Sequence, residues 1–198
     1  MKSTQAALAA IILVVSCAGA RATIVEEAIG ITFPDRIGNM VLRGRTPFPD
    51  PRLGAVIRYE EDGRDLRAGG LTVGVYVYNG GLRHVSGDLD SRQMRLNFRE
   101  VISEVKQMQK LGKVKAVNLP PDDEHVTTLA GCGPQFLWER YEIDLDGTTM
   151  LTSATYMTSL HDNFVKLRIS HLKDDATSAK LEEDFLPQLH HVLGDCAH

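Results

Sequence analysis

The sequence predicts an α+β fold in which an antiparallel β-sheet is sandwiched by a long central helix and a C-terminal helix. Three consecutive strands are expected over 136–145, 148–159 and 164–172, because strand-like runs with period-two patterning are separated there by short polar turns. A helical pattern of apolar residues precedes this meander, and a second one ends the chain. A sheet whose apolar surface is covered by two helices is the economical way to bury these residues.

The segments before the long helix are mostly extended. Residues 30–34 are expected to be extended, because the residue before Pro34 avoids the helical region. The segment 23–29 fits either a turn of helix or a lead-in, and the proline-rich segment 46–51 is expected to be a loop. Strands are expected over 40–45, 54–60 and 71–78.

The long helix is expected to begin near Asp90 and to stop at Gly112. Asp90 and Gln93 have the spacing of a capping box, and Gly112 suits the C′ position. Short strands are expected to follow over 113–119 and 126–130, with a polar loop over 122–125 between them. Residues at intervals of three and four form one apolar helix face: Met94, Phe98, Val101, Ile102, Val105 and Met108.

Two turns and a final helix complete the predicted fold. Asp146-Gly147 predicts a type I′ hairpin turn, which needs positive φ at both residues, and 161–163 form the tip of the next hairpin. A helix over 176–193 is expected to kink at Pro187, which lacks a backbone donor. In the last strand, one face is expected to carry Val165, Leu167 and Ile169, and the other Lys166, Arg168 and Ser170.

The first twenty residues have the anatomy of a secretory signal peptide, which predicts an exported protein, periplasmic or secreted. A basic start precedes the apolar run 6–15, and small residues follow it. Two processing routes are open. Cleavage after Ala20 would leave a chain that starts at Arg21, whereas the lipoprotein-like box Val14–Cys17 would leave a lipid anchor on Cys17.

A single α+β domain over 30–198 is expected to follow the signal peptide 1–20 and the lead-in 21–29. The net charge of −4 becomes −5 once Lys2 is removed, and this mildly acidic balance gives no indication of nucleic-acid binding. Export favours a disulfide between Cys132 and Cys196, the alternative being two free or intermolecular thiols. The bridge would close a loop of about 64 residues, the difference between 196 and 132, and contribute roughly 4 kcal/mol.

The order of elements and several short motifs resemble the PsbP-like fold, the α/β/α sandwich of the extrinsic photosystem subunit and its non-photosynthetic relatives. The matching motifs are Phe33–Gly38, Val75–Tyr78, Trp138–Ile143 and Phe164–Arg168. With the meander and the terminal helix they span about residues 30–193, and they are similar to uncharacterised exported bacterial proteins of this shape. The resemblance implies a protein that docks on partners, often at membranes, and it brings no catalytic residue.

The candidate partner-binding surface is a basic stripe on the long helix. It consists of Arg92, Arg95, Arg99, Lys106 and Lys110, and Glu100 and Glu104 fall on the other flank of the helix. A basic stripe on an acidic protein suits an anionic protein partner or an anionic membrane surface. The alternative is an ordinary solvated helix face.

The sequence favours an exported, non-catalytic binding or assembly module with an unknown partner, without a cofactor, a metal site or a catalytic residue. The rival hypothesis is a hydrolase or metal-dependent enzyme that uses histidines and Cys132. His190-His191 with Cys196 and His198 is the densest cluster, but adjacent histidines on a helix diverge and zinc-ligand spacing is lacking. Cys132 with His125 upstream is a weaker candidate for a thiol nucleophile and its base.

Overall fold

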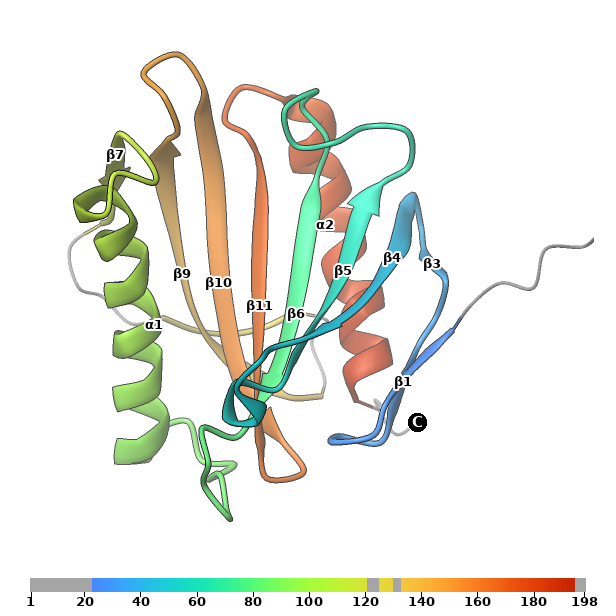
Figure 1. Ribbon diagram of the computed structural model, residues 1–198. Helices are drawn as coiled ribbons and strands as arrows, with labels where there is room; N and C mark the ends of the chain where they lie inside the picture. The colour runs from blue at the N-terminus through green and yellow to red at the C-terminus, as the bar shows by residue number, and fades with distance from the viewer. Residues whose placement is uncertain (1–22, 121–124, 130–132, 195–198) are drawn as a thin grey trace, which may run out of the picture.

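The computed structural model describes residues 23–120, 125–129 and 133–194, and within them the fold is α+β (Figure 1). No helix in these ranges has the length and apolar character needed to cross a membrane. The strands are β1 (Ile24–Glu26), β2 (Ile31–Phe33), β3 (Arg36–Ile37), β4 (Met40–Pro47), β5 (Ala55–Glu61), β6 (Thr72–Tyr78), β7 (Ala116–Asn118), β8 (His125–Thr128), β9 (Gln135–Asp144), β10 (Met150–Leu160) and β11 (Asn163–Leu172). The helices are η1 (Pro51–Leu53), α1 (Arg92–Lys110) and α2 (Ala176–Leu193).

The described strands form one large antiparallel sheet and a small β1–β2 ribbon. The order in the large sheet is β3-β4-β5-β6-β11-β10-β9-β7, and β8 pairs with the other part of β9. The meander β9–β10–β11 is therefore confirmed. Pairing of β6 with β11 joins the N-terminal strands to this meander, and their register places Tyr76 opposite Lys166 and Gly74 opposite Arg168.

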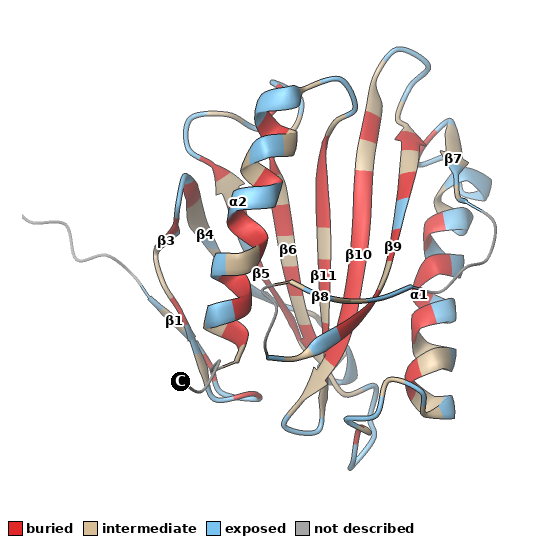
Figure 2. Cartoon of the chain, turned by 180° about the vertical axis from the view of Figure 1, so that it is seen from behind, coloured by how far each residue is buried: buried red, intermediate tan, exposed pale blue. Residues whose placement is uncertain are grey.

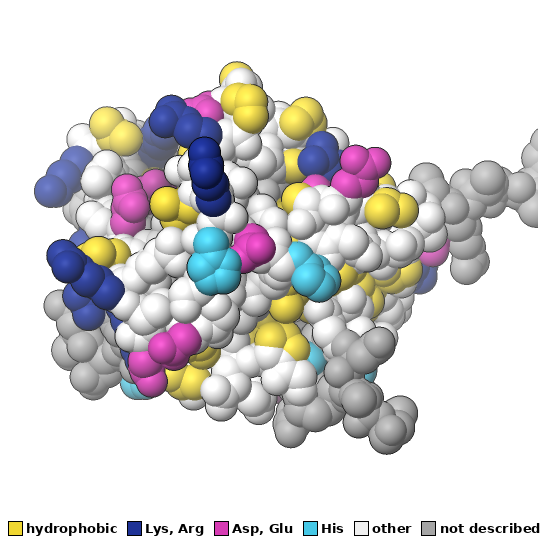
Figure 3. All heavy atoms as spheres, turned by 90° about the horizontal axis from the view of Figure 1, so that it is seen from below, with side chains coloured by type: hydrophobic (Ala, Val, Ile, Leu, Met, Phe, Trp, Pro, Cys, Tyr) yellow, Lys and Arg dark blue, Asp and Glu magenta, His cyan; other side chains and the backbone are white. Residues whose placement is uncertain are grey.

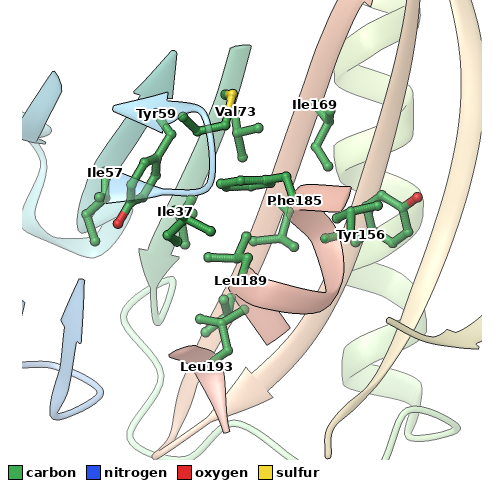
Figure 4. Close-up of a cluster of buried hydrophobic side chains, with 14 of the residues drawn as sticks. Ile37, Ile57, Tyr59, Val73, Tyr156, Ile169, Phe185, Leu189 and Leu193 are labelled. Carbon is green, nitrogen blue, oxygen red and sulfur yellow. The ribbon is translucent and has the colours of Figure 1, made fainter. Parts of the chain in front are cut away.

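Helix α2 packs against one face of the sheet. The ring of Phe185 in α2 lies 5.7 Å from the ring of Tyr59, and Leu189 is fully buried beside it (Figure 4). The strands supply Val165, Leu167 and Ile169 to the same cluster, as their alternation predicts. Burial of this continuous apolar layer is the main stabilising contribution on this side. The buried stripe of α2 that faces the sheet is visible in Figure 2.

Helix α1 contributes to a second cluster on the opposite face of the sheet. Five of its six predicted apolar residues are buried, and Met108 is partly buried. Their partners include Leu137, Tyr141 and Ile143 of β9. Helix α1 therefore lies over the β9 side of the sheet and leaves the β5–β6 side of this face without a helix (Figure 1).

The ends of α1 correct one prediction and confirm another. The N-cap is Ser91, whose hydroxyl accepts a hydrogen bond from the Met94 amide, and not Asp90. The carboxamide of Gln93 instead accepts from the Ser86 amide at 2.8 Å, so it fixes the preceding loop. Gly112 has φ +66°, as a C′ residue needs, and the amide of Lys113 reaches the Met108 carbonyl to complete a Schellman motif.

The turn prediction at Asp146-Gly147 is wrong in type. Only Gly147 has positive φ, so the turn is not type I′. The Asp146 carboxylate accepts hydrogen bonds from the amides of Thr148 and Thr149, each at 2.9 Å, and a longer loop results. Positive φ at two successive non-glycine residues occurs instead at His161 and Asp162, the two-residue turn between β10 and β11.

The short elements differ in extent from their predictions. Strand β7 covers only residues 116–118 of the expected 113–119, and β8 begins at His125, a residue that the sequence places in a loop. The segment 23–29 contains β1, and Ile29 at its end is buried in the α2 cluster. Helix α2 has the predicted bounds and continues through Pro187.

Candidate functional site

The candidate site is a groove between α1 and the uncovered part of the sheet, which we call the α1 groove. It has a volume of about 630 Å³. Its floor is formed by β6 and β11, with Tyr76 and Tyr78 from the first and Lys166 and Arg168 from the second. One wall is α1, and the other is formed by Phe48, by η1 and by the segment that follows β6. The groove exists because α1 covers only part of this face.

Strand register brings the polar residues of the groove together. Lys166 and Arg168 are two residues apart in β11, so both project from the α1 side, while Val165 and Leu167 face α2. In β6, Gly74 pairs with Arg168 on one side and with Arg58 of β5 on the other. Arg58 and Arg168 therefore flank a glycine that has no side chain of its own, and Arg168 shares the floor of the groove with Lys166.

Aromatic rings hold Lys166 in place. The Tyr76 ring folds over Gly74, where an added Cβ would lie 2.9 Å from Cε2 of the tyrosine. The same ring stacks on Phe48, with a centroid separation of 6.3 Å and an interplanar angle of 12°. The Lys166 ammonium lies 4.5 Å from the Tyr76 centroid and 5.7 Å from that of Tyr78, which is cation–π geometry.

The floor of the α1 groove carries two cationic side chains, Lys166 and Arg168, and neither has a carboxylate close to it among the described residues. Burial lowers the pKa of Lys166, Glu104 acts in the opposite direction, and Arg168 adds repulsion. The Arg168 guanidinium contacts the Met108 sulfur at 3.5 Å. Among the described residues, neither Lys166 nor Arg168 has a carboxylate within ion-pair distance.

Tyr78, at the α1 side of the floor, is held by a hydrogen bond to an uncharged side chain. The Tyr78 hydroxyl donates to the Asn97 side-chain oxygen at 2.7 Å, and burial raises the pKa of this hydroxyl. Glu100 and Glu104 lie exposed along the α1 wall. The groove is therefore cationic at its floor and acidic along its helical wall.

The predicted basic stripe lies apart from the α1 groove. Arg92, Arg99, Lys106 and Lys110 are exposed, whereas Arg95 is only 21% exposed and pairs with Asp90 at 2.5 Å. Their spacing places them on the flank of α1 opposite Glu100 and Glu104. On the face seen in Figure 3, cationic, acidic and histidine side chains are intermixed.

The described histidines are scattered over the fold. His84 pairs with Asp162, His161 lies 2.7 Å from the Ile29 carbonyl, and His125 lies beside Trp138. His190 is buried against Phe136, and His191 is exposed. No group of three or more potential metal ligands occurs within the described ranges. Cys17, Cys132, Cys196 and His198 lie outside those ranges.

Described residues near the two candidate disulfide cysteines in the sequence are close neighbours in the fold. A Cβ added at Gly194 would lie 3.0 Å from Cδ of Pro134, and one added at Gly133 would collide with the His190 ring. Pro134 and Gly194 are each two residues from a cysteine in the sequence. The two cysteines themselves lie outside the described residues, so the bridge between them stays a prediction.

A second polar cluster lies under α2, away from the groove. The buried Glu182 carboxylate accepts a hydrogen bond from Arg140 at 2.6 Å, and its other oxygen lies 3.3 Å from Nε2 of His171. His171 is 3% exposed at its side chain, and Glu182 raises its pKa. The sequence did not indicate this cluster, because its members belong to β9, β11 and α2.

The sequence also failed to identify the floor of the α1 groove. Alternation places Lys166 and Arg168 on the polar face of their strand, but nothing local indicates that β6 would place an aromatic ring beside them. The one available signal was a pair of cations inside a strand between buried apolar residues. Comparisons with protein-family models, curated proteins and solved structures give no match to this chain.

Proposed function

We propose that the protein is an exported, non-catalytic binding module with a PsbP-like sandwich fold, and that the α1 groove is its binding site. The sandwich is supported by the two buried clusters on opposite faces of one antiparallel sheet, each with its own helix. Export is supported by the signal-peptide anatomy of the first twenty residues.

One observation carries the binding proposal. The floor of the α1 groove holds Lys166 and Arg168, two cations without a carboxylate at ion-pair distance among the described residues, in an aromatic setting. Removing a cation from water without a counter-charge is unfavourable, and a bound ligand would compensate for it. A concave site with apolar walls and a few converging polar groups is the usual form of a ligand pocket.

The location of the site can be tested with 8-anilinonaphthalene-1-sulfonate, an anionic aromatic dye that fluoresces when it leaves water. Leu53 lines the groove and is 51% exposed, whereas Val25 lies on β1 outside it and is 56% exposed. Leu53→Ser is expected to weaken saturable dye binding, and Val25→Ser to leave it unchanged. Equal dye affinity in both variants would reject the α1 groove as the site.

We propose that the basic stripe is a second binding surface, which contacts an anionic membrane. Arg92, Lys106 and Lys110 are exposed, and none of them forms an ion pair with a described residue. A lipid on Cys17 would hold the protein near such a surface, where each basic residue contributes about 1 kcal/mol.

Vesicle sedimentation tests the membrane proposal. Lys106→Glu is expected to reduce binding to vesicles that contain phosphatidylglycerol, while Lys180→Glu on α2, with the same change in net charge, leaves it nearly unchanged. Binding that resists added salt, or that responds equally to both substitutions, would argue against the stripe.

A further inference from the structure

We infer that the α1 groove binds a small organic acid in which one anionic group is attached to an apolar body. This inference rests on the proposed function and adds the chemical class of the ligand. It follows from three features of the groove: where its cations lie, where its exposed apolar surface lies, and where its carboxylates lie.

The anionic group would lie over Lys166 and Arg168. Residues two apart on one face of a strand are separated by about 7 Å, so an anion placed between the two side chains can contact both. The Lys166 ammonium is already oriented by the Tyr76 ring, which reduces the loss of side-chain freedom on binding. A charge-assisted hydrogen bond is stronger than a neutral one, and the half-buried setting weakens its screening by solvent.

The apolar body would lie along the wall opposite α1. Leu53 and Leu82 line this wall and are 51% and 41% exposed, so both offer apolar surface to a ligand. Phe48 extends the same wall and stacks on Tyr76, so it connects the apolar rim to the cationic floor. A ligand that covers these side chains removes apolar area from water while its anionic end reaches Lys166.

The acidic wall limits the ligand to one negative charge. Glu104 acts on Lys166 through its charge, and Glu100 lies one turn earlier on the same wall. A second anionic group directed toward α1 would meet these carboxylates. The volume of about 630 Å³ falls within the range of small-molecule pockets, about 300–1,000 Å³. Size and charge together point to a monoanion of moderate size.

Displacement of the bound dye from the full chain tests the ligand class. Decanoate has one carboxylate, decanedioate has two on a chain of equal length, and decanol has none. Decanoate is expected to displace the dye at least tenfold more effectively than either of the others. Glu104→Gln is expected to narrow the difference between decanoate and decanedioate, because it removes part of the repulsion.

Substitutions locate the anion. Lys166→Met is expected to weaken decanoate binding about tenfold, and Lys166→Arg, which keeps the charge, to restore most of it. Lys180→Met on α2, outside both the groove and the basic stripe, is the matched control and should have no effect. Thermal unfolding of each variant verifies that it is folded.

The outcomes separate the ligand class from the site. If the dye binds in the groove but decanol displaces it as well as decanoate does, the organic-acid inference is wrong and the groove is an apolar site. The inference is equally wrong if decanedioate binds more tightly than decanoate, or if Lys166→Met leaves decanoate affinity unchanged. If Leu53→Ser does not affect dye binding, the proposed site itself is wrong.

Discussion

Replacing Glu182 by glutamine is expected to abolish most of the stability change of the protein between about pH 6 and pH 8. The Nδ1 atom of His171 lies 2.7 Å from the Leu172 carbonyl, an acceptor, so the neutral ring keeps its proton on Nδ1. The Nε2 atom then faces the Glu182 carboxylate at 3.3 Å. In the neutral ring, Nε2 and the Glu182 carboxylate are both acceptors and cannot bond to each other. Protonation at Nε2 converts the contact into an ion pair, and the pKa of His171 is raised accordingly.

The direction of the pH effect follows from the raised pKa. A histidine whose pKa is higher in the folded state contributes its full stabilisation below the pKa of an unfolded histidine, near 6.5. This contribution is lost as the pH rises through the folded-state pKa of His171. The wild-type free energy of unfolding should therefore fall from pH 6 to pH 8, and that of Glu182→Gln should stay nearly level.

The magnitude follows from the burial of the partners. His171 and Glu182 are 3% and 4% exposed, so their contact contributes about 2 kcal/mol, as for a buried hydrogen bond to a charged group. Arg140 is 45% exposed, and its pair with Glu182 is screened to about 1 kcal/mol. Glu182→Gln is therefore expected to cost about 3 kcal/mol at pH 6 and about 1 kcal/mol at pH 8.

Urea unfolding at pH 6, 7 and 8 measures these free energies by linear extrapolation. Glu183→Gln is the matched control, because Glu183 is the next residue of α2 and its side chain is 72% exposed. It should change the free energy of unfolding by less than about 0.5 kcal/mol at each pH. A Glu182→Gln variant that keeps the wild-type pH dependence would refute the reasoning.

Three further predictions concern other parts of the chain. Because burial lowers the pKa of Lys166, dye affinity should decline with rising pH earlier in the wild type than in Lys166→Arg, measured by fluorescence titration. Gly54→Ala should lower the free energy of unfolding in urea by about 3 kcal/mol, because φ is +62° and the new methyl group would collide with a β6 carbonyl. Gly63→Ala is the control: φ is +77° but the space around it is open, so the loss should be only about 1 kcal/mol. If Cys132 and Cys196 are bridged, serine at either one should lower the free energy of unfolding by the same amount, roughly 4 kcal/mol, and serine at both should cost no more.

The sequence predicted those elements of the fold that local periodicity determines. The buried face of α1 follows from apolar residues at intervals of three and four, and the faces of β11 follow from strict alternation. Turn type was less predictable. At Asp146 the side chain hydrogen-bonds to two following amides, which competes with the type I′ geometry that Asp-Gly otherwise favours. At His161-Asp162 the register of two long strands imposes the tight turn.

The α1 groove was not predictable, because its floor depends on pairing between distant segments. Lys166 meets Tyr76 only since β6 lies next to β11, and about 90 residues separate the two in the chain. The basic stripe was found because helical spacing is a local property. The groove needed the strand order, which no sequence pattern here determines.

A substitution at Lys166 should affect folding stability and ligand binding in different directions. The α1 side of β11 would be stable with an apolar side chain at this position, because burial of the ammonium is unfavourable and no described carboxylate lies within ion-pair distance. Lys166→Met, which keeps the unbranched shape but loses a cation–π contact of about 0.5–1 kcal/mol, should therefore unfold with an equal or higher free energy than the wild type. The same variant should bind decanoate about tenfold more weakly than the wild type. A loss of stability larger than about 1 kcal/mol in urea unfolding would instead mean that Lys166 supports the fold, and that its position in the groove needs no ligand to explain it.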